Sequence, residues 1–130
     1  MGSGKSDYTI GKGGKGTSGS KDDGFRKVKG HTTRLHRDAQ GKHIPGHKNY
    51  VPDAGRSIFK GSLQDAQELV SQFAGTGYWP TSNKEVVDFG KTIGTWVDGA
   101  SGVRLPTSRG TIHYGKHGTH IVPANPNRKR

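Results

Sequence analysis

The sequence predicts a small α+β domain in which one amphipathic helix packs on a sheet of about four antiparallel strands. Apolar residues recur at helical spacing after Ser62 and stop before Gly75. Short clusters of β-favouring residues, separated by glycines, follow between residues 86 and 123. Only 27% of the 130 residues are apolar and none is cysteine. The core is therefore small, and packing rather than disulfide bonds has to stabilise it.

The first part of the chain has little to bury. Residues 1–24 are rich in Gly, Ser and Lys, which is typical of a flexible linker. We expect the folded domain to span residues 25–127 and to be followed by a short basic tail, residues 128–130. Residues 25–52 are basic and rich in histidine, and glycines and prolines interrupt them repeatedly. This composition predicts loops or short turns.

The helix prediction depends on a capping pattern and an apolar stripe. Ser62 can cap a helix N-terminus, and Asp65 follows three residues later, where a carboxylate can complete a capping box. The apolar positions that share one helical face are Leu63, Ala66, Leu69, Val70 and Phe73. Gly75 then ends the pattern. We expect about three turns of helix whose apolar stripe faces the following strands.

Strand material fills the rest of the domain. Clusters of β-branched and aromatic residues alternate with turn-forming glycines. The expected strands contain residues 86–89, 93–97, 103–105, 110–114 and 119–123. Strands that follow one another through short turns favour an antiparallel sheet.

The last two expected strands form a hairpin whose register can be predicted. If Gly115 opposes Gly118 across a two-residue loop, His113 faces His120. Strand alternation then assigns Ile112, Tyr114 and Ile121 to the core face. The opposite face receives Arg109, Thr111, His113, His120 and Val122. Two imidazoles and a guanidinium would thus share one open face of the sheet.

The charge of the chain indicates a polyanionic partner. The net charge is +11 and the isoelectric point is about 10.1. Residues 26–48 hold seven Lys and Arg against the single acid Asp38. Clustered cations of this kind bind phosphates by releasing condensed counterions. The alternative is that the charge serves solubility alone.

The residues on the open face match the requirements for metal-independent RNA cleavage. One imidazole can remove a 2′-hydroxyl proton and another can protonate the leaving 5′-oxygen, each contributing roughly 10² to 10⁴ in rate. An arginine can stabilise charge on the phosphorane. The alternative is that these side chains are ordinary solvent-exposed residues of the sheet and have no catalytic role. A metal site is not expected, because the acids are dispersed and Pro45 and Gly46 disfavour a helix between His43 and His47. No cofactor is expected either.

Several ordered blocks of sequence resemble the polymorphic toxin type 50 domain, a C-terminal module of bacterial contact-dependent and phage-associated effectors. The resemblance covers about residues 40–127 and leaves residues 1–39 unmatched. Two of its five blocks are continuous, residues 42–50 and 55–58. The other three have gaps: residues 65–69 and 73–77, residues 87–91 and 93–94, and residues 106–107, 112–114 and 118–124. It implies the fold of the barnase, EndoU, colicin and RelE type ribonucleases, in which an N-terminal helical part packs on a four-stranded antiparallel sheet.

The resemblance also implies a set of functional residues. The catalytic candidates are His43, Arg109, His113 and His120, and the secondary candidates are Thr107, Tyr114 and Lys116. Contacts to RNA are expected from Lys42, Lys48, Arg56 and Lys91. The family often has Gly-Thr where this chain has Gly46-His47, so His47 is expected to lie outside the shared set.

The function implied is an endoribonuclease toxin that leaves a 2′,3′-cyclic phosphate. The resemblance further implies delivery as the C-terminal part of a larger secreted effector, action in the target-cell cytoplasm and neutralisation by a cognate immunity protein. We expect a monomer, and no apolar stretch approaches the ~18 residues of a membrane span. Two alternatives stay open: a non-catalytic basic RNA-binding module and a metal-dependent DNase toxin.

Overall fold

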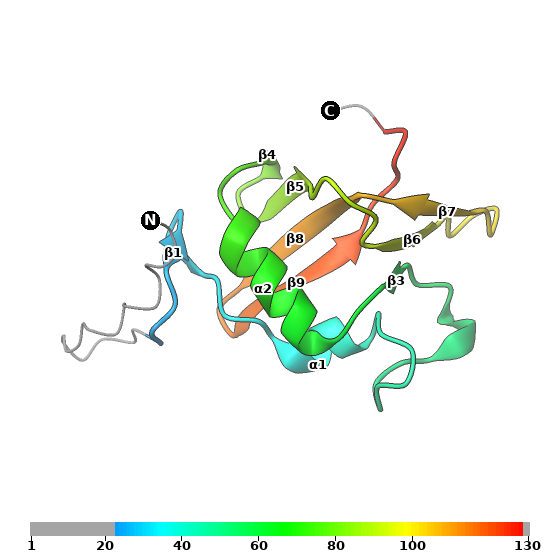
Figure 1. Cartoon of the computed structure of the whole chain (residues 1–130), viewed down its shortest axis with the longest axis horizontal. Coiled ribbons are helices and arrows are strands. Elements are labelled where there is room, and N and C mark those ends of the chain that lie inside the picture. The colour runs from blue at the N-terminus through cyan, green and yellow to red at the C-terminus, as the bar shows by residue number, and fades with distance from the viewer. Residues whose placement is uncertain (1–22, 129–130) are drawn as a thin grey trace.

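The computed structural model describes residues 23–128 and shows an α+β fold with few helices and several antiparallel sheets (Figure 1). A four-stranded sheet has the order β4-β5-β8-β9, and a three-stranded sheet has the order β3-β6-β7. The strands of the larger sheet are β4 (Tyr78–Thr81), β5 (Lys84–Asp88), β8 (Arg109–Gly115) and β9 (Gly118–Pro123). Those of the smaller sheet are β3 (Ile58–Phe59), β6 (Gly94–Val97) and β7 (Arg104–Thr107).

The remaining elements are short except for one helix. Strands β1 (Lys27–Val28) and β2 (His31–Thr32) form a small antiparallel pair, and α1 (Arg37–Gly41) follows. A single 3-10 turn covers Pro52–Ala54, and α2 spans Leu63–Phe73. In Figure 1, α2 lies across the strands of the four-stranded sheet. The core is formed where α2 meets β8 and β9, and its most buried members include Ala66, Val70, Ile112 and Ile121.

The predicted helix is confirmed, together with its cap. The hydroxyl oxygen of Ser62 accepts a hydrogen bond from the Asp65 amide at 3.1 Å, and the Asp65 carboxylate accepts one from the Ser62 amide at 2.8 Å. The hydrogen bonds from Ser62 lower the pKa of the Asp65 carboxyl. A cap of this kind typically contributes about 1 kcal/mol. It sets the start of α2 and therefore which side chains of α2 face the sheet.

The prediction of a single sheet is wrong in two respects. The expected strands 93–97 and 103–105 correspond to β6 and β7, which pair with β3 in a separate sheet. The four-stranded sheet is completed instead by β4, which was not predicted. Pro80 lies within β4 and argues against a strand by composition, but β4 is an edge strand, where a missing amide is tolerated.

The expectation of loops or short turns over residues 25–52 misses α1 and the β1-β2 pair. Helix α1 has only five residues, which is too short to produce a helical period in the sequence. Tertiary contacts hold it in place: the Gln40 side-chain amide donates to the Ile121 carbonyl at 3.0 Å, and the Ile121 amide donates to the Gln40 side-chain oxygen at 2.7 Å. These bonds cover the outer edge of β9, which would otherwise expose unpaired backbone groups.

The backbone just before α1 covers the same edge. Leu35 forms a parallel bridge with Thr119, and the His36 amide donates to the Thr119 carbonyl at 2.8 Å. The Thr119 amide in turn donates to the Arg34 carbonyl at 2.8 Å. The chain therefore runs along β9 from residue 34 through α1. The loop that follows α1 therefore lies beside β9.

The predicted linker and basic tail lie largely outside the described residues, which exclude 1–22 and 129–130. Asp23, in the last part of the predicted linker, accepts hydrogen bonds from the Phe25 amide and the Thr32 hydroxyl and forms an ion pair with Arg34. In the described part of the chain, no helix is both long and apolar enough to cross a bilayer.

Candidate active site

The register of the β8-β9 hairpin is the one predicted. Gly115 opposes Gly118, His113 opposes His120, and Ile112 opposes Ile121. Both isoleucines are 0% exposed and belong to the core. His113 and His120 are half-buried and lie on the opposite face of the sheet. A two-residue loop and strand alternation thus place two imidazoles side by side.

A third imidazole joins them from the loop that follows α1. The rings of His43 and His120 are stacked with centroids 5.9 Å apart and planes inclined by 19°. The rings of His113 and His120 are stacked at 5.0 Å and 21°. His43, His120 and His113, in this order, form what we call the histidine row. Because His43 is far from the hairpin in sequence, the row exists only through the packing of α1 against β9.

The surroundings of His43 determine which of its nitrogens is protonated in the neutral ring. Its Nδ1 lies 2.8 Å from the carbonyl oxygen of Ser57. A carbonyl only accepts, so Nδ1 carries the hydrogen and Nε2 keeps a free lone pair. The Ser57 hydroxyl oxygen accepts from the Val97 amide at 3.0 Å, and the Phe59 amide donates to the His43 carbonyl at 2.7 Å. His43 is therefore held with a proton-accepting nitrogen, although only 8% of its surface is exposed.

All three rings of the row are less basic than ordinary histidines. Burial lowers the pKa of His120 to about 3, helped by the neighbouring rings of His113 and His43. Burial, the charge of Lys84 and the ring of His43 lower the pKa of His113. Burial is the main cause here because the charged imidazolium loses hydration.

The pKa of His43 is lowered by burial and by the positive charges of Arg56 and Lys42, while its hydrogen bond to Ser57 acts in the opposite direction. At neutral pH the whole row is therefore uncharged in the free protein. An anion bound beside the row would favour protonation of a ring, because opposite charge stabilises the imidazolium.

Arg56 provides a cation next to the row. Its Nη1 atom is buried and has no hydrogen-bond partner among the described residues. Arg56 precedes Ser57, which orients His43, so the guanidinium and the imidazole are held by adjacent residues. A buried donor without an acceptor is costly, typically by about 1 to 3 kcal/mol, and native proteins rarely keep one without a reason. Its positive charge lies close enough to His43 to lower the pKa of that ring.

Arg109 lies on the predicted face but not beside the row. It opposes Asp88 on β5, whereas His113, four residues further along β8, opposes Lys84. At ~3.3 Å per residue, the two positions are separated by roughly 13 Å along the strand. Hydrogen bonds from Gly90 and Ser108, and the charge of Arg109, lower the pKa of Asp88. The structure thus separates Arg109 from the histidines with which the sequence grouped it.

The secondary candidates also lie away from the row. Thr107 is buried, and its hydroxyl donates to the Ala124 carbonyl at 2.7 Å. Tyr114 is buried on the core face, where its hydroxyl donates to Glu85 at 2.6 Å. Lys116 is exposed in the hairpin loop. Thr107 and Tyr114 therefore hold the backbone and core together in this structure.

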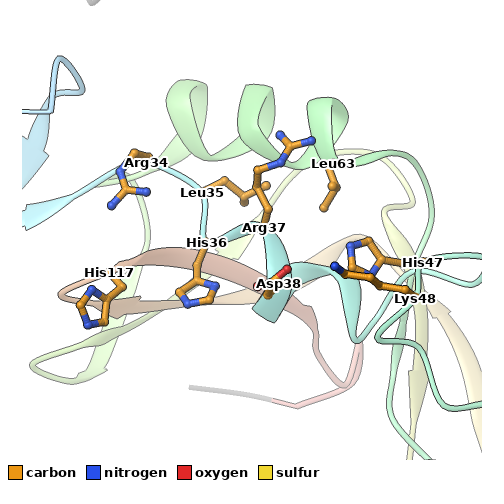
Figure 2. Close-up of a pocket in the computed structure, with 9 residues that line it drawn as sticks. All are labelled: Arg34, Leu35, His36, Arg37, Asp38, His47, Lys48, Leu63 and His117. Carbon is orange, nitrogen blue, oxygen red and sulfur yellow. The ribbon is translucent and has the colours of Figure 1, made fainter.

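The four expected RNA-binding residues are dispersed. Lys42 is exposed, and its charge lowers the pKa of both His43 and His120, so it lies close to the row. Lys91 contributes to lowering the pKa of Asp65, which places it near the start of α2. Lys48 lines a separate pocket beside α1 (Figure 2). Only Lys42 and Arg56 among them adjoin the histidines.

Glu85 is a buried polar residue that sequence reasoning missed. It is 0% exposed, and its carboxylate accepts hydrogen bonds from the amides of Gly75 and Gly77 and from the hydroxyl of Tyr114. Burial and the bond to Glu85 raise the pKa of Tyr114. Strand alternation offered a signal, because Glu85 shares its face of β5 with Val87, which is also buried.

The described residues contain no group of three or more His, Asp or Glu side chains arranged to hold a metal ion. The three rings of the row are nearly parallel, so they stack by their faces rather than directing nitrogens to a common point. The arrangement is suited to proton transfer between a base and an acid across a bound anion.

Comparison with known proteins identifies the family. The family model for bacterial toxin 50 matches residues 35–123, which is more than half of the chain. The chain belongs to the bacterial toxin 50 family. The match runs from the segment before α1 to the end of β9 and so includes the whole histidine row. The resemblance stated from the sequence is confirmed, and this is a bacterial toxin domain. A search of curated proteins finds no match.

Proposed function

We propose that this toxin domain is a metal-independent endoribonuclease that cleaves RNA by attack of the substrate's own 2′-hydroxyl. The products are a 2′,3′-cyclic phosphate and a 5′-hydroxyl end. The observation that carries the proposal is the histidine row, in which a proton acceptor of fixed tautomer stacks on two further imidazoles. Membership of a bacterial toxin family and a net charge of +11 support an anionic target inside a cell.

In the proposed reaction, Nε2 of His43 accepts the proton of the 2′-hydroxyl. The 2′-oxygen then forms a bond to phosphorus, and the bond from phosphorus to the 5′-oxygen breaks. The leaving oxygen receives a proton from the pair formed by His113 and His120. These rings stack at 5.0 Å and both have lowered pKa values, so the pair carries at most one proton. The bound phosphodiester supplies the negative charge that stabilises this proton.

Arg56 is the residue best placed to bind the reacting phosphate. Its buried Nη1 has no hydrogen-bond partner within residues 23–128, and its charge already acts on His43. A preorganised donor directed at developing negative charge is typically worth about 10² to 10³ in rate. Lys42 adds positive charge at the same end of the row. Arg109, further along the face, would contact a neighbouring phosphate of the strand rather than the cleaved one.

The proposal includes the features that the resemblance implies beyond this site. They are a ribonuclease fold of the barnase, EndoU, colicin and RelE type, delivery as the C-terminal part of a larger effector and action in the target-cell cytoplasm. A monomeric domain inhibited by an immunity protein completes the proposal. The basic surface favours an acidic inhibitor, because complementary charge speeds association.

The experiment that tests the proposal is digestion of total RNA by the purified chain in excess EDTA, followed by sequencing of the cleaved ends. We expect 2′,3′-cyclic phosphate ends, loss of cleavage in the His43→Gln and His113→Gln variants, and intact plasmid DNA. His31→Gln is a matched control, because His31 stacks on Trp79 and Tyr114 outside the row. RNA binding without cleavage would indicate the non-catalytic module instead. Cleavage of DNA that EDTA abolishes would indicate a metal-dependent DNase.

A further inference from the structure

A second basic pocket lies beside the N-terminal end of α1, apart from the histidine row. Its volume is about 480 Å³. Figure 2 shows its lining side chains coming from the segment that leads into α1, the first residues of α1, the loop after α1, the start of α2 and the tip of the β8-β9 hairpin. Three of them are permanent cations, namely Arg34, Arg37 and Lys48, and one is the carboxylate Asp38. Arg34 already forms an ion pair with Asp23 at 3.2 Å, so Arg37 and Lys48 supply the positive charge that no ion pair within the described residues neutralises. Leu35 and Leu63 form its apolar part.

Two of the three imidazoles that line this pocket, His36 and His47, carry their hydrogen on Nε2. Nδ1 of His36 accepts from the Ala39 amide at 3.1 Å, and Nδ1 of His47 accepts from the Asn49 amide at 3.0 Å. A backbone amide only donates, so in each neutral ring the hydrogen is on Nε2. Both rings therefore offer an N–H group even without charge. This is the reverse of His43, whose Nε2 accepts, so the pocket is built to bind an anion rather than to remove a proton.

The pocket adjoins the proposed active site through the edge of β9. The His36 amide bonds to the carbonyl of Thr119, the residue before His120, and the charge of His36 contributes to the low pKa of His120. Lys48 lies in the same loop as His43, the one that follows α1. A polyanion lying on the histidine row can thus extend into the pocket without leaving the basic surface.

We propose that this pocket is a second phosphate-binding subsite, which holds a phosphate of the same RNA strand away from the cleaved bond. The inference rests on the proposed function, because it assumes that RNA occupies the histidine row. Its net positive charge and the Nε2–H groups of His36 and His47 match phosphate oxygens, and its volume suits one nucleotide unit. The subsite contributes strand affinity, while the chemistry belongs to the row.

The test uses binding rather than cleavage, so that it does not depend on the proposed reaction. A fluorescent single-stranded RNA with 2′-O-methyl groups lacks the attacking hydroxyl, and its affinity is measured by anisotropy over a range of salt concentrations. We expect the double variant Arg37→Gln/Lys48→Gln to bind several-fold more weakly. Its plot of log affinity against log salt should be shallower by ~0.7 for each phosphate that the variant no longer neutralises. A dinucleotide too short to reach the pocket should show no difference.

Arg104→Gln is the matched control, because Arg104 is an exposed arginine on β7 in the other sheet. Arg37 and Lys48 are also exposed, and thermal unfolding of each single variant verifies that the fold is retained. The proposal is overturned if the double variant binds the long RNA as the control does, or if its salt dependence is unchanged.

The outcomes separate this subsite from the proposed function. Weaker binding by the double variant in a chain that cleaves no RNA would retain the subsite and reject the ribonuclease. Cleavage that depends on His43, combined with unaltered binding by the double variant, would reject the subsite alone. If RNA binding is unaltered but the variant escapes neutralisation by its inhibitor protein, the pocket is a protein-docking surface and the proposal fails.

Discussion

The two faces of the larger sheet bury polar side chains in different ways. On the core face, Glu85 accepts hydrogen bonds from two backbone amides and from Tyr114. On the opposite face, the histidine row is held by stacking and by the bond from His43 to Ser57. The two arrangements arise at adjacent positions of the β5-β8 pair. Glu85 opposes Ile112 on the core face, and Lys84 opposes His113 on the other face.

The difference separates a structural cluster from the cluster that we propose to be reactive. Glu85 has its acceptors filled by donors of the protein, so the cluster stabilises the turn between α2 and β4. The histidine row is partly buried, and no carboxylate of the described residues contributes to the pKa shifts of its rings, all of which are lowered. In the proposed function, the substrate supplies the negative charge beside the row. Substitutions on the two faces should accordingly affect different measurements.

The largest effect is expected at the proton acceptor. His43→Gln should lower the RNA cleavage rate by roughly 10² to 10⁴, because a general base of this kind contributes about that factor. Single-turnover cleavage of a labelled RNA measures the rate, with His31→Gln as the control. If His43→Gln strongly lowered the unfolding temperature and left the cleavage rate per folded molecule unchanged, His43 would have a structural role instead of a catalytic one.

Glu85→Ala should act on stability instead. It removes the acceptor of two backbone amides and of the buried Tyr114 hydroxyl and is expected to reduce the free energy of unfolding by roughly 3 to 5 kcal/mol. Chemical denaturation measures this change. Glu68→Ala is the matched control, because Glu68 is exposed on α2, and such surface changes usually stay within about 0.5 kcal/mol. Equal effects of the two variants would contradict a structural role for the buried cluster.

The arginines Arg56 and Arg109 should differ in their effects. Arg56→Gln is expected to lower the cleavage rate by about 10² to 10³, since its guanidinium adjoins His43. Arg109→Gln should lower it less, because Arg109 opposes Asp88 at the other end of β8. Cleavage rates of both variants, measured at saturating RNA, test the assignment. A larger loss of rate for Arg109→Gln would indicate that Arg109, and not Arg56, binds the reacting phosphate.

Tyr114→Phe measures how much the hydrogen bond between Tyr114 and Glu85 contributes to stability. It removes the hydroxyl that donates to Glu85 at 2.6 Å and keeps the ring that stacks on Trp79. A hydrogen bond to a charged group is worth about 1.5 to 3 kcal/mol, and the free energy of unfolding should fall by that amount. A double-mutant cycle with Glu85→Gln isolates the pair. Additive effects would show that the hydroxyl and the carboxylate are not coupled.

The smallest effect concerns pH. The pKa of His120 is about 3 in the folded chain against an ordinary value of 6.5, so the unfolded chain binds more protons between these values. Folding stability should therefore be fully present above pH 6.5 and fall on acidification, by about 1.4 kcal/mol for each pH unit from this group. Denaturation between pH 7 and pH 5 should show this slope, and His120→Gln should reduce it. An unchanged slope in that variant would assign the acid sensitivity to other groups.

The parts of the fold that could be predicted are those that neighbouring residues control. The period of α2 and its capping box are visible between Ser62 and Phe73, and the β8-β9 register follows from the loop between Gly115 and Gly118. The membership of β6 and β7 in a second sheet could not be predicted. Strand propensity identifies a segment as β but does not identify its partner, which in this case is the two-residue strand β3.

The amino-acid sequence by itself determined that His113 and His120 lie side by side, because a two-residue turn and strand alternation are local properties. Only the tertiary structure decided that His43 stacks on His120, that Arg56 rather than Arg109 adjoins the row, and that Glu85 is enclosed. Each of these depends on contacts between segments distant in the chain, such as the bonds between Gln40 and Ile121. Such contacts form when whole elements pack together, and no short stretch of sequence specifies them.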